Sequence, residues 1–271
     1  MIFQRNPSLF PSLLSIFLLI QLPRASSNYS EEFYQTCGRP FSCGHITSVG
    51  YPFWAANDPP YCGYPGLALT CNEDNIPRIK IKNMNYQILD IYPTTQTIRI
   101  SREDVMKTNC PTDLINNTLD YTLFDYVSTS INLTFFYGCP SISGQNFLSC
   151  KTINNGNGVL VLPGEMGPGR CNASVIYPVA EMGTAVVGKM VNYSGLDQIL
   201  RQGFDVRWKV DGLKACSDCS MSGGRCGYDM GINRTTCFCP FPPYVTTTCS
   251  IRIGASPRSP PSPDTRSLKN H

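Results

Sequence analysis

Alternating apolar and polar residues between positions 76 and 102 give the clearest structural signal in this chain. Three runs, 78–82, 86–92 and 96–102, alternate with a period of two, and turn-forming residues separate them. A half-buried β-strand requires this period, because successive side chains point to opposite faces of a sheet. The segment therefore predicts two consecutive β-hairpins.

Two later segments repeat the pattern. Asn132 stands in a glycosylation sequon, so its face of the strand 131–137 must point to solvent. The opposite face would then be buried and consists of Ile131, Leu133, Phe135 and Tyr137. The segment 204–210 alternates in the same way and leaves three charged side chains outside, those of Asp205, Arg207 and Lys209.

Helical periodicity is scarce. We predict only one short helix, over 196–201, ended by Gly203. Gly and Pro number 22 each, which favours short strands joined by turns. The predicted fold class is mostly β and disulfide-rich, with two small cysteine-rich modules of short strands and loops and little helix.

The chain contains fourteen cysteines, an even number that allows up to seven disulfides in an oxidising compartment. We expect all of them to be oxidised, with the front four and the last six each pairing among themselves. They are Cys37, Cys43, Cys62, Cys71, Cys110, Cys139, Cys150, Cys171, Cys216, Cys219, Cys226, Cys237, Cys239 and Cys249. The pairs at 216/219 and 237/239 have zinc-like spacing, but two further cysteines and the oxidising compartment favour disulfides. We therefore predict neither a metal nor a cofactor.

The first 27 residues have the basic, apolar and small-residue regions of a signal peptide. Six Asn-x-Ser/Thr sequons also fit a secreted glycoprotein, at Asn28, Asn116, Asn132, Asn172, Asn192 and Asn233. We divide the remainder into a front domain at 28–104, a back domain at 105–250 and a disordered, basic, Pro/Ser-rich tail at 251–271. After Cys249 the sequence offers neither a span of about 20 apolar residues nor a kinase motif, so we expect this polypeptide to be released from the cell rather than held in the plasma membrane.

Charge narrows the choice of ligand. Residues 28–250 have a net charge of −2, which gives no support to nucleic-acid binding, whereas 75–102 has a net charge of +4. We predict a binding site for an acidic ligand on this basic strand, formed by Arg78, Lys80 and Lys82 and joined by Arg99 on a neighbouring strand. A ladder of cations would meet the carboxylates of an extended acidic polymer, although a solvated outer strand face would have the same composition. Tyr61 and Tyr64 are weaker candidates for stacking on a ligand ring, because they also suit a small core.

The sequence offers few residues that could catalyse a reaction. His45 and His271 are the only histidines, which leaves a Ser/His or Cys/His nucleophile almost without a base. We predict no catalytic residues and a protein that is not an enzyme.

Ordered motifs carry a family resemblance over about 34–249. The front half contains Cys37-x5-Cys43, Gly50-Tyr-Pro-Phe-Trp54 and Tyr61-Cys-Gly-Tyr-Pro-Gly66, and it resembles the galacturonan-binding domain of plant wall-associated receptor kinases. The back half contains Gly203-Phe-x-Val-x-Trp208 and Cys216-x2-Cys219-x2-Ser-Gly-Gly-x-Cys226, and it resembles the C-terminal domain of the same kinases. Together they resemble the ectodomain of leaf-rust-resistance-type receptor-like kinases.

The resemblance implies a non-catalytic, extracellular contact with pectic polysaccharide or oligogalacturonide in the cell wall. The acidic ligand would then be a uronic-acid polymer, and the carbohydrate-binding residues would be Arg78, Lys80, Lys82 and Arg99. The rival interpretation is a receptor ectodomain that recognises a peptide or a protein co-receptor. In that case the chain would belong to a serine/threonine receptor kinase gene whose membrane span and kinase are absent from this sequence.

Overall fold

The computed structural model describes residues 31–108, 110–117, 119–127, 130–140, 148, 158–164, 167, 169–180, 186–187, 190–191 and 193–250. The predicted signal peptide, Asn28, Cys150, Asn192 and the tail 251–271 lie outside the described residues. The other four sequon asparagines are all exposed.

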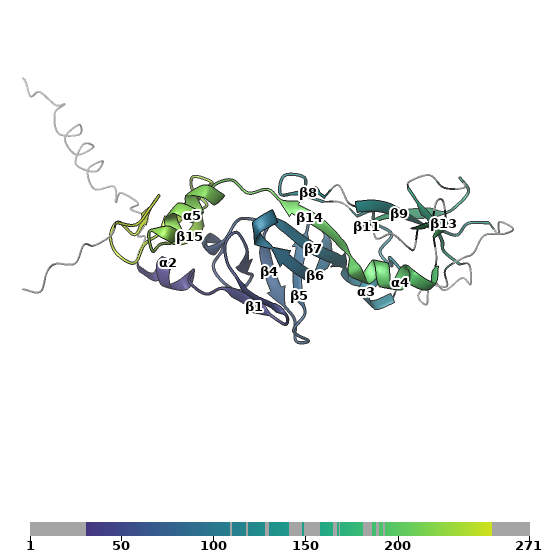
Figure 1. The fold of residues 1–271 in the computed structure, drawn as a ribbon, viewed down its shortest axis with the longest axis horizontal. Helices are drawn as coiled ribbons and strands as arrows, with labels where there is room; N and C mark the ends of the chain where they lie inside the picture. The colour runs from purple at the N-terminus through teal and green to yellow at the C-terminus, as the bar shows by residue number, and fades with distance from the viewer. Residues whose placement is uncertain are drawn as a thin grey trace, which may run out of the picture.

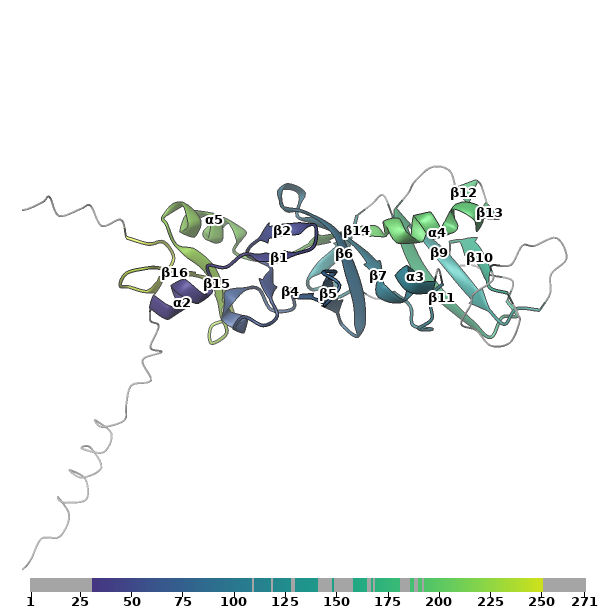
Figure 2. The ribbon, with the colours of Figure 1, turned by 90° about the horizontal axis from the view of Figure 1, so that it is seen from below.

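The described part of the chain is elongated, with three regions along its long axis (Figures 1 and 2). A seven-stranded sheet occupies the middle. A three-stranded sheet lies at one end, and a helix with three short strands lies at the other. We name this last region, residues 213–249, the C-terminal cysteine module.

The central sheet has the strand order β3-β4-β5-β6-β7-β14-β8. All neighbours are antiparallel except β3 and β4. The strands are β3 (Trp54–Ala55), β4 (Ala68–Cys71), β5 (Pro77–Ile81), β6 (Met84–Tyr92), β7 (Thr97–Arg102), β14 (Phe204–Trp208) and β8 (Phe124–Tyr126). The two hairpins predicted from 78–102 are confirmed as β5-β6 and β6-β7.

The sheet does not stop at residue 104. Strand β14 pairs with β7 over the register Phe204↔Ile100 to Arg207↔Thr97, although about a hundred residues separate the two strands. One hydrophobic core contains side chains from both halves of the chain, among them Phe41, Ile79, Val175 and Trp208. A continuous sheet and core therefore connect the front of the chain to its back.

A second sheet has the order β10-β9-β11, built from β9 (Ser130–Tyr137), β10 (Leu160–Pro163) and β11 (Ala173–Ala180). On β9 Asn132 is exposed, whereas Leu133, Phe135 and Tyr137 are buried, as the alternation predicts. Ile131 is half-buried, near the strand's beginning. Phe136 is buried as well and packs with Cys139 and Leu160 in a separate small cluster, so the end of this central strand is covered on both faces.

The predicted helix is confirmed as α4 (Tyr193–Gln202), which begins three residues earlier than expected. The expectation of a single helix was wrong. The structure adds α2 (Glu31–Thr36), α3 (Glu103–Thr108) and α5 (Leu213–Met221), with 3-10 turns η1 (Pro60–Cys62) and η2 (Pro93–Thr95). In α5 the cysteines at 216 and 219 are three residues apart and so share one helix face, a pattern that is hard to distinguish from a cysteine-rich loop.

The remaining strands are short. Near the front of the chain, β1 (Phe41–Cys43) pairs with β2 (Ile46–Val49). In the back half, β12 (Val186–Val187) pairs with β13 (Met190–Val191). In the C-terminal cysteine module, β16 (Arg234–Phe238) lies between β15 (Arg225–Asp229) and β17 (Val245–Thr246).

Disulfides close the loops within each group of cysteines. The front four form Cys37–Cys62 and Cys43–Cys71, and the last six form Cys216–Cys226, Cys219–Cys237 and Cys239–Cys249. Cys139 pairs with Cys171, and Cys110 is also disulfide-bonded. The mostly β, disulfide-rich class is therefore confirmed.

The buried Tyr177 predicts an alkaline limit to stability. Burial raises its pKa to about 12, and the hydrogen bond with the Ser101 hydroxyl opposes this shift. The unfolded chain loses this proton near pH 10, whereas the folded chain keeps it. The contribution of Tyr177 to the free energy of unfolding is therefore complete below pH 10 and is lost as the pH rises toward 12. We expect a loss of about 2 to 3 kcal/mol from this group.

Urea unfolding between pH 9 and pH 12, together with the absorbance of the phenolate, measures this loss. Tyr177→Phe removes the ionisable group, so this variant should lose less stability over the same range. A Tyr177 that titrates near pH 10 in the folded protein would contradict the prediction.

Candidate functional site

The basic strand lies where the sequence predicts, but its cations are not equivalent. On β5 the apolar side chains are buried, Arg78 is half-buried and Lys80 is exposed. Lys82 lies beyond the strand, in the two-residue turn before β6, with a φ of 52°. It therefore belongs to the hairpin turn and does not continue the straight ladder of Arg78 and Lys80.

Ion pairs within the protein occupy two of the four predicted site residues. Arg78 pairs with Glu103 at 2.8 Å, and Glu103 also accepts from Lys107. Arg99 binds both carboxylate oxygens of Asp205, at 2.8 and 3.1 Å. The hydrogen bond to Asp205 raises the pKa of Arg99, so the pair keeps the guanidinium in its charged form.

Lys80 and Lys82 have no ion pair among the described residues. Two hydrogen bonds from Thr122 lower the pKa of Asp120, and the charge of Lys82 contributes further to this shift. Arg102, the fifth cation of 75–102, is fully buried beside Asp104. Most of the local positive charge is therefore neutralised, and Lys80 and Lys82 provide the part that faces solvent.

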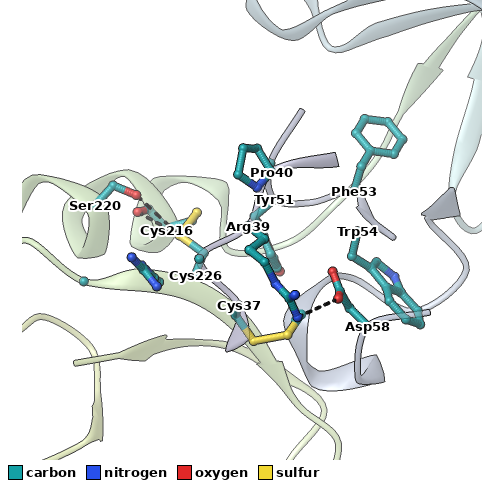
Figure 3. A pocket seen from close by; sticks show the side chains of 15 residues that line it. Cys37, Arg39, Pro40, Tyr51, Phe53, Trp54, Asp58, Cys216, Ser220 and Cys226 are labelled. Carbon is teal, nitrogen blue, oxygen red and sulfur yellow. Dashed lines mark hydrogen bonds and ion pairs between the residues drawn. A yellow bond between two sulfur atoms is a disulfide. The ribbon is translucent and has the colours of Figure 1, made fainter. Parts of the chain in front are cut away.

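A second candidate lies where the front of the chain meets the C-terminal cysteine module. A cavity of about 430 Å³, here called the junction cavity, is lined by residues from 37–62 and from 216–226. Arg39 lies across it and pairs with Asp58 at 3.5 Å (Figure 3). The Arg39 side chain is 75% exposed, so its guanidinium is open to solvent. Sequence patterns gave no signal for it, because an isolated arginine between cysteines belongs to no periodic surface.

Arg225 fixes one wall of this cavity. Its guanidinium donates to the carbonyls of Tyr34 and Gln35, at 2.6 and 3.3 Å, and lies 4.1 Å from the Tyr34 ring centre. A Cβ at Gly38 would lie only 1.7 Å from the Arg225 Nη1, so only glycine leaves room for this contact. The disulfides Cys37–Cys62 and Cys216–Cys226 each cross-link one side of the junction cavity. The walls are therefore largely preformed.

The aromatic residues near the cavity divide into two groups. Tyr61 packs on Phe33 with ring centres 4.4 Å apart, and Tyr64 packs on Tyr228 at 5.0 Å. Tyr61 also lies 5.9 Å from the Phe238 ring, so both of these weaker candidates join the front of the chain to the C-terminal cysteine module. Trp54 is half-buried, lines the junction cavity and donates its indole N–H to the Tyr64 carbonyl at 3.1 Å.

Tyr51 also lines the junction cavity. Burial raises its pKa to about 12, and a 2.7 Å hydrogen bond with the Thr235 hydroxyl opposes this shift. Tyr51 therefore stays a neutral hydroxyl at physiological pH and adds no charge to the cavity.

Potential catalytic and metal-binding groups have structural partners. The His45 ring nitrogen Nε2 lies 2.8 Å from the Leu89 carbonyl. The sulfur atoms of Cys237, Cys239 and Cys249 lie within 4.8 Å of one another, but each is bonded in a disulfide. A metal needs thiolates, which disulfide sulfurs do not provide.

These observations define a disulfide-stabilised, mostly β protein with a cavity between the front of the chain and the C-terminal cysteine module. Comparison with known families agrees: residues 37–102 match the wall-associated receptor kinase galacturonan-binding family, and residues 150–241 match the wall-associated receptor kinase C-terminal family. The chain belongs to the wall-associated kinase ectodomain family of receptor-like proteins.

Two relatives from Arabidopsis thaliana illustrate the similarity. The chain is 33% identical over 215 residues to leaf rust 10 disease-resistance locus receptor-like protein kinase-like 2.4, covering 78% of this chain and 33% of the relative. It is 30% identical over 261 residues to the kinase-like 1.2 protein, covering 90% of this chain and 38% of the relative. The chain thus spans about a third of the length of these relatives, and only their ectodomain part aligns.

No solved structure matches the chain. Among the helices in the described residues, none has the length and apolar character needed to cross a membrane.

Proposed function

We propose that this chain is a secreted, non-catalytic binding protein for pectic polysaccharide, and that it contacts galacturonan carboxylates in the cell wall. The observation that carries the proposal is the galacturonan-binding family match over 37–102, the region that contains the two lysines without ion pairs. Front and back domains at 28–104 and 105–250, six N-glycans and a cleaved signal peptide at 1–27 are part of the same proposal.

The binding surface consists of Arg78 and Lys80 of β5, Lys82 of the following turn and Arg99 of β7. Lys80 and Lys82 are exposed and meet ligand carboxylates directly, whereas Arg78 and Arg99 join only if the ligand displaces Glu103 and Asp205. An exposed charge pair is worth a few tenths to about 1 kcal/mol, so affinity depends on several contacts along a polymer.

We expect replacement of both Lys80 and Lys82 by Gln to weaken binding to de-esterified oligogalacturonides by about tenfold at low salt. Calorimetric titration over a salt series measures this effect, and the affinity of the unmodified protein should fall as ionic strength rises. A double Gln variant of Lys214 and Arg234, two exposed cations of the C-terminal cysteine module, is the matched control and should bind normally.

Absence of binding at any salt concentration would overturn the proposal and favour a protein partner. The alternative function is recognition of a peptide or co-receptor. Three exposed apolar side chains between α3 and β8 favour it: Leu114, Ile115 and Tyr121 are 53%, 55% and 61% exposed. In that case the chain is the ectodomain of a receptor whose longer form is held in the membrane.

A further inference from the structure

A second cavity adjoins the junction cavity. This edge cavity, about 630 Å³, is lined by parts of β1, the 55–58 turn and the end of β4. The two cavities share Arg39, Pro40 and Asp58 in their linings. They are therefore neighbours, with the exposed Arg39 side chain between them.

The far end of the edge cavity lies next to the basic strand. Strand β3 pairs with β4 only at Ala68 and Leu69, so this edge of β4 is open at Thr70 and Cys71, which line the cavity. On its other side Thr70 pairs directly with Arg78 of β5. Residues paired across strands lie about 5 Å apart and share a face of the sheet. The edge cavity thus ends one strand away from Arg78, and Lys80 follows two residues later on the same face.

We propose that one acidic polysaccharide chain occupies a single path, from the junction cavity past Arg39, along the edge cavity and across Thr70 to Arg78 and Lys80. This inference rests on the proposed function and places most of the ligand on residues outside the basic strand.

The chemistry along the path suits a polymer of sugar carboxylates. Arg39 has one ion pair, with Asp58 at 3.5 Å, and its side chain is mostly exposed, so its other guanidinium N–H groups can donate to a ligand carboxylate. In the junction cavity Trp54 provides a ring for stacking on a sugar face. In the edge cavity Ser42, Asn57 and Thr70 provide hydrogen-bonding groups for sugar hydroxyls.

The path is also preorganised. Two disulfides, Cys37–Cys62 and Cys216–Cys226, stabilise the walls of the junction cavity. A third, Cys43–Cys71, joins β1 to β4 beside the edge cavity. A binding surface held in place by disulfides loses little conformational entropy when a ligand orders on it. A flexible polysaccharide would then bear most of the ordering cost.

The test uses three single variants of the full secreted chain, Arg39→Gln, Lys80→Gln and, as the matched control, Lys214→Gln. Lys214 resembles Arg39 because it is 89% exposed and has one carboxylate partner, Asp218, at 3.1 Å. Each protein is titrated with a long oligogalacturonide and with a disaccharide. With the long ligand, Arg39→Gln and Lys80→Gln should each weaken binding by about fivefold. The variant that carries both of these changes should bind about 25-fold more weakly, and Lys214→Gln should bind as the unmodified protein does.

A disaccharide cannot reach both ends of the path, so the two losses should no longer multiply for this ligand. If Arg39→Gln binds the long ligand as the unmodified protein does while Lys80→Gln binds weakly, the polymer stays on the strand, and this inference fails although the proposed function stands. If Lys214→Gln weakens binding as much as Arg39→Gln, the affinity depends only on the net charge of the protein, and the path is likewise refuted. If the unmodified protein does not bind, the proposed function and the path fail together.

Tryptophan fluorescence gives a readout that does not depend on any variant. The chain has two tryptophans, of which Trp208 is only 3% exposed, whereas Trp54 lines the junction cavity. A long oligogalacturonide on the proposed path should shield Trp54 from acrylamide. Quenching that is unchanged at saturating ligand would overturn the path.

Discussion

Replacement of Asp104 by Asn should lower the free energy of unfolding by about 3 to 5 kcal/mol, because it leaves a fully buried guanidinium without its countercharge. The Arg102 side chain has no exposure to solvent, and that of Asp104 is only 9% exposed. The Arg102 Nε and Nη2 donate to the two Asp104 carboxylate oxygens, at 3.0 and 2.8 Å. Breaking a buried pair on one side costs far more than losing a surface pair, since the remaining charge stays desolvated.

The pair also holds three segments together. Arg102 ends β7 and donates to the carbonyls of Asp113 and Ile115, at 3.0 and 2.8 Å. The Asp104 carboxylate, in the first turn of α3, accepts from the backbone N–H groups of Val105, Thr112 and Asp113. Asn offers one acceptor oxygen where Asp offers two, so backbone donors would lose partners as well.

Glu103→Gln is the matched control, because Glu103 is adjacent in sequence but forms ion pairs nearer the surface, with Arg78 and Lys107. We expect this change to cost no more than about 1 kcal/mol. Urea unfolding of the disulfide-intact protein measures both. Equal effects of the two substitutions would show that the Arg102–Asp104 pair is not the special contact described here.

The alternation along β7 contained information that the site prediction did not use. Alternation places Arg102 on the same face of β7 as Ile98 and Ile100, which are buried, so the strand assignment already implied that Arg102 is not a surface cation. The charge count for 75–102 ignored this and overstated the basic surface. The strands β5, β6, β7, β9 and β14 were predictable because each of them alternates between apolar and polar residues over much of its length.

Other features depended on partners far away in the sequence. Asp205 neutralises Arg99 across the pairing of β14 with β7, which spans 106 residues and has no local signature. The junction cavity likewise combines 37–62 with 216–226. Cysteine spacing indicated how disulfides group along the chain, but it carried no information on which strands continue the central sheet.

The link between α4 and β14 leads to the second large effect. Gly203 alone separates Gln202, the last residue of α4, from Phe204, the first of β14. Its φ is +65°, and a Cβ there would lie 2.2 Å from the Ile100 carbonyl oxygen on β7. Gly203→Ala must therefore accept a left-handed backbone and displace β14 from β7. We expect a loss of about 2 to 5 kcal/mol, from about 1 to 2 for the backbone conformation and about 1 to 3 for the overpacking.

Gly223→Ala separates these two contributions. Gly223 also has a positive φ, +81°, but a Cβ there would have no neighbour within 4 Å, so only the conformational cost of about 1 to 2 kcal/mol applies. The difference between the two variants in urea unfolding isolates the contact with Ile100. Because β14 is the strand that joins the back of the chain to the central sheet, Gly203→Ala should also increase amide hydrogen exchange in β7 and β14, an increase that Gly223→Ala should not produce. If the two glycine variants lose equal stability and exchange alike, the close approach at Gly203 does not constrain this junction.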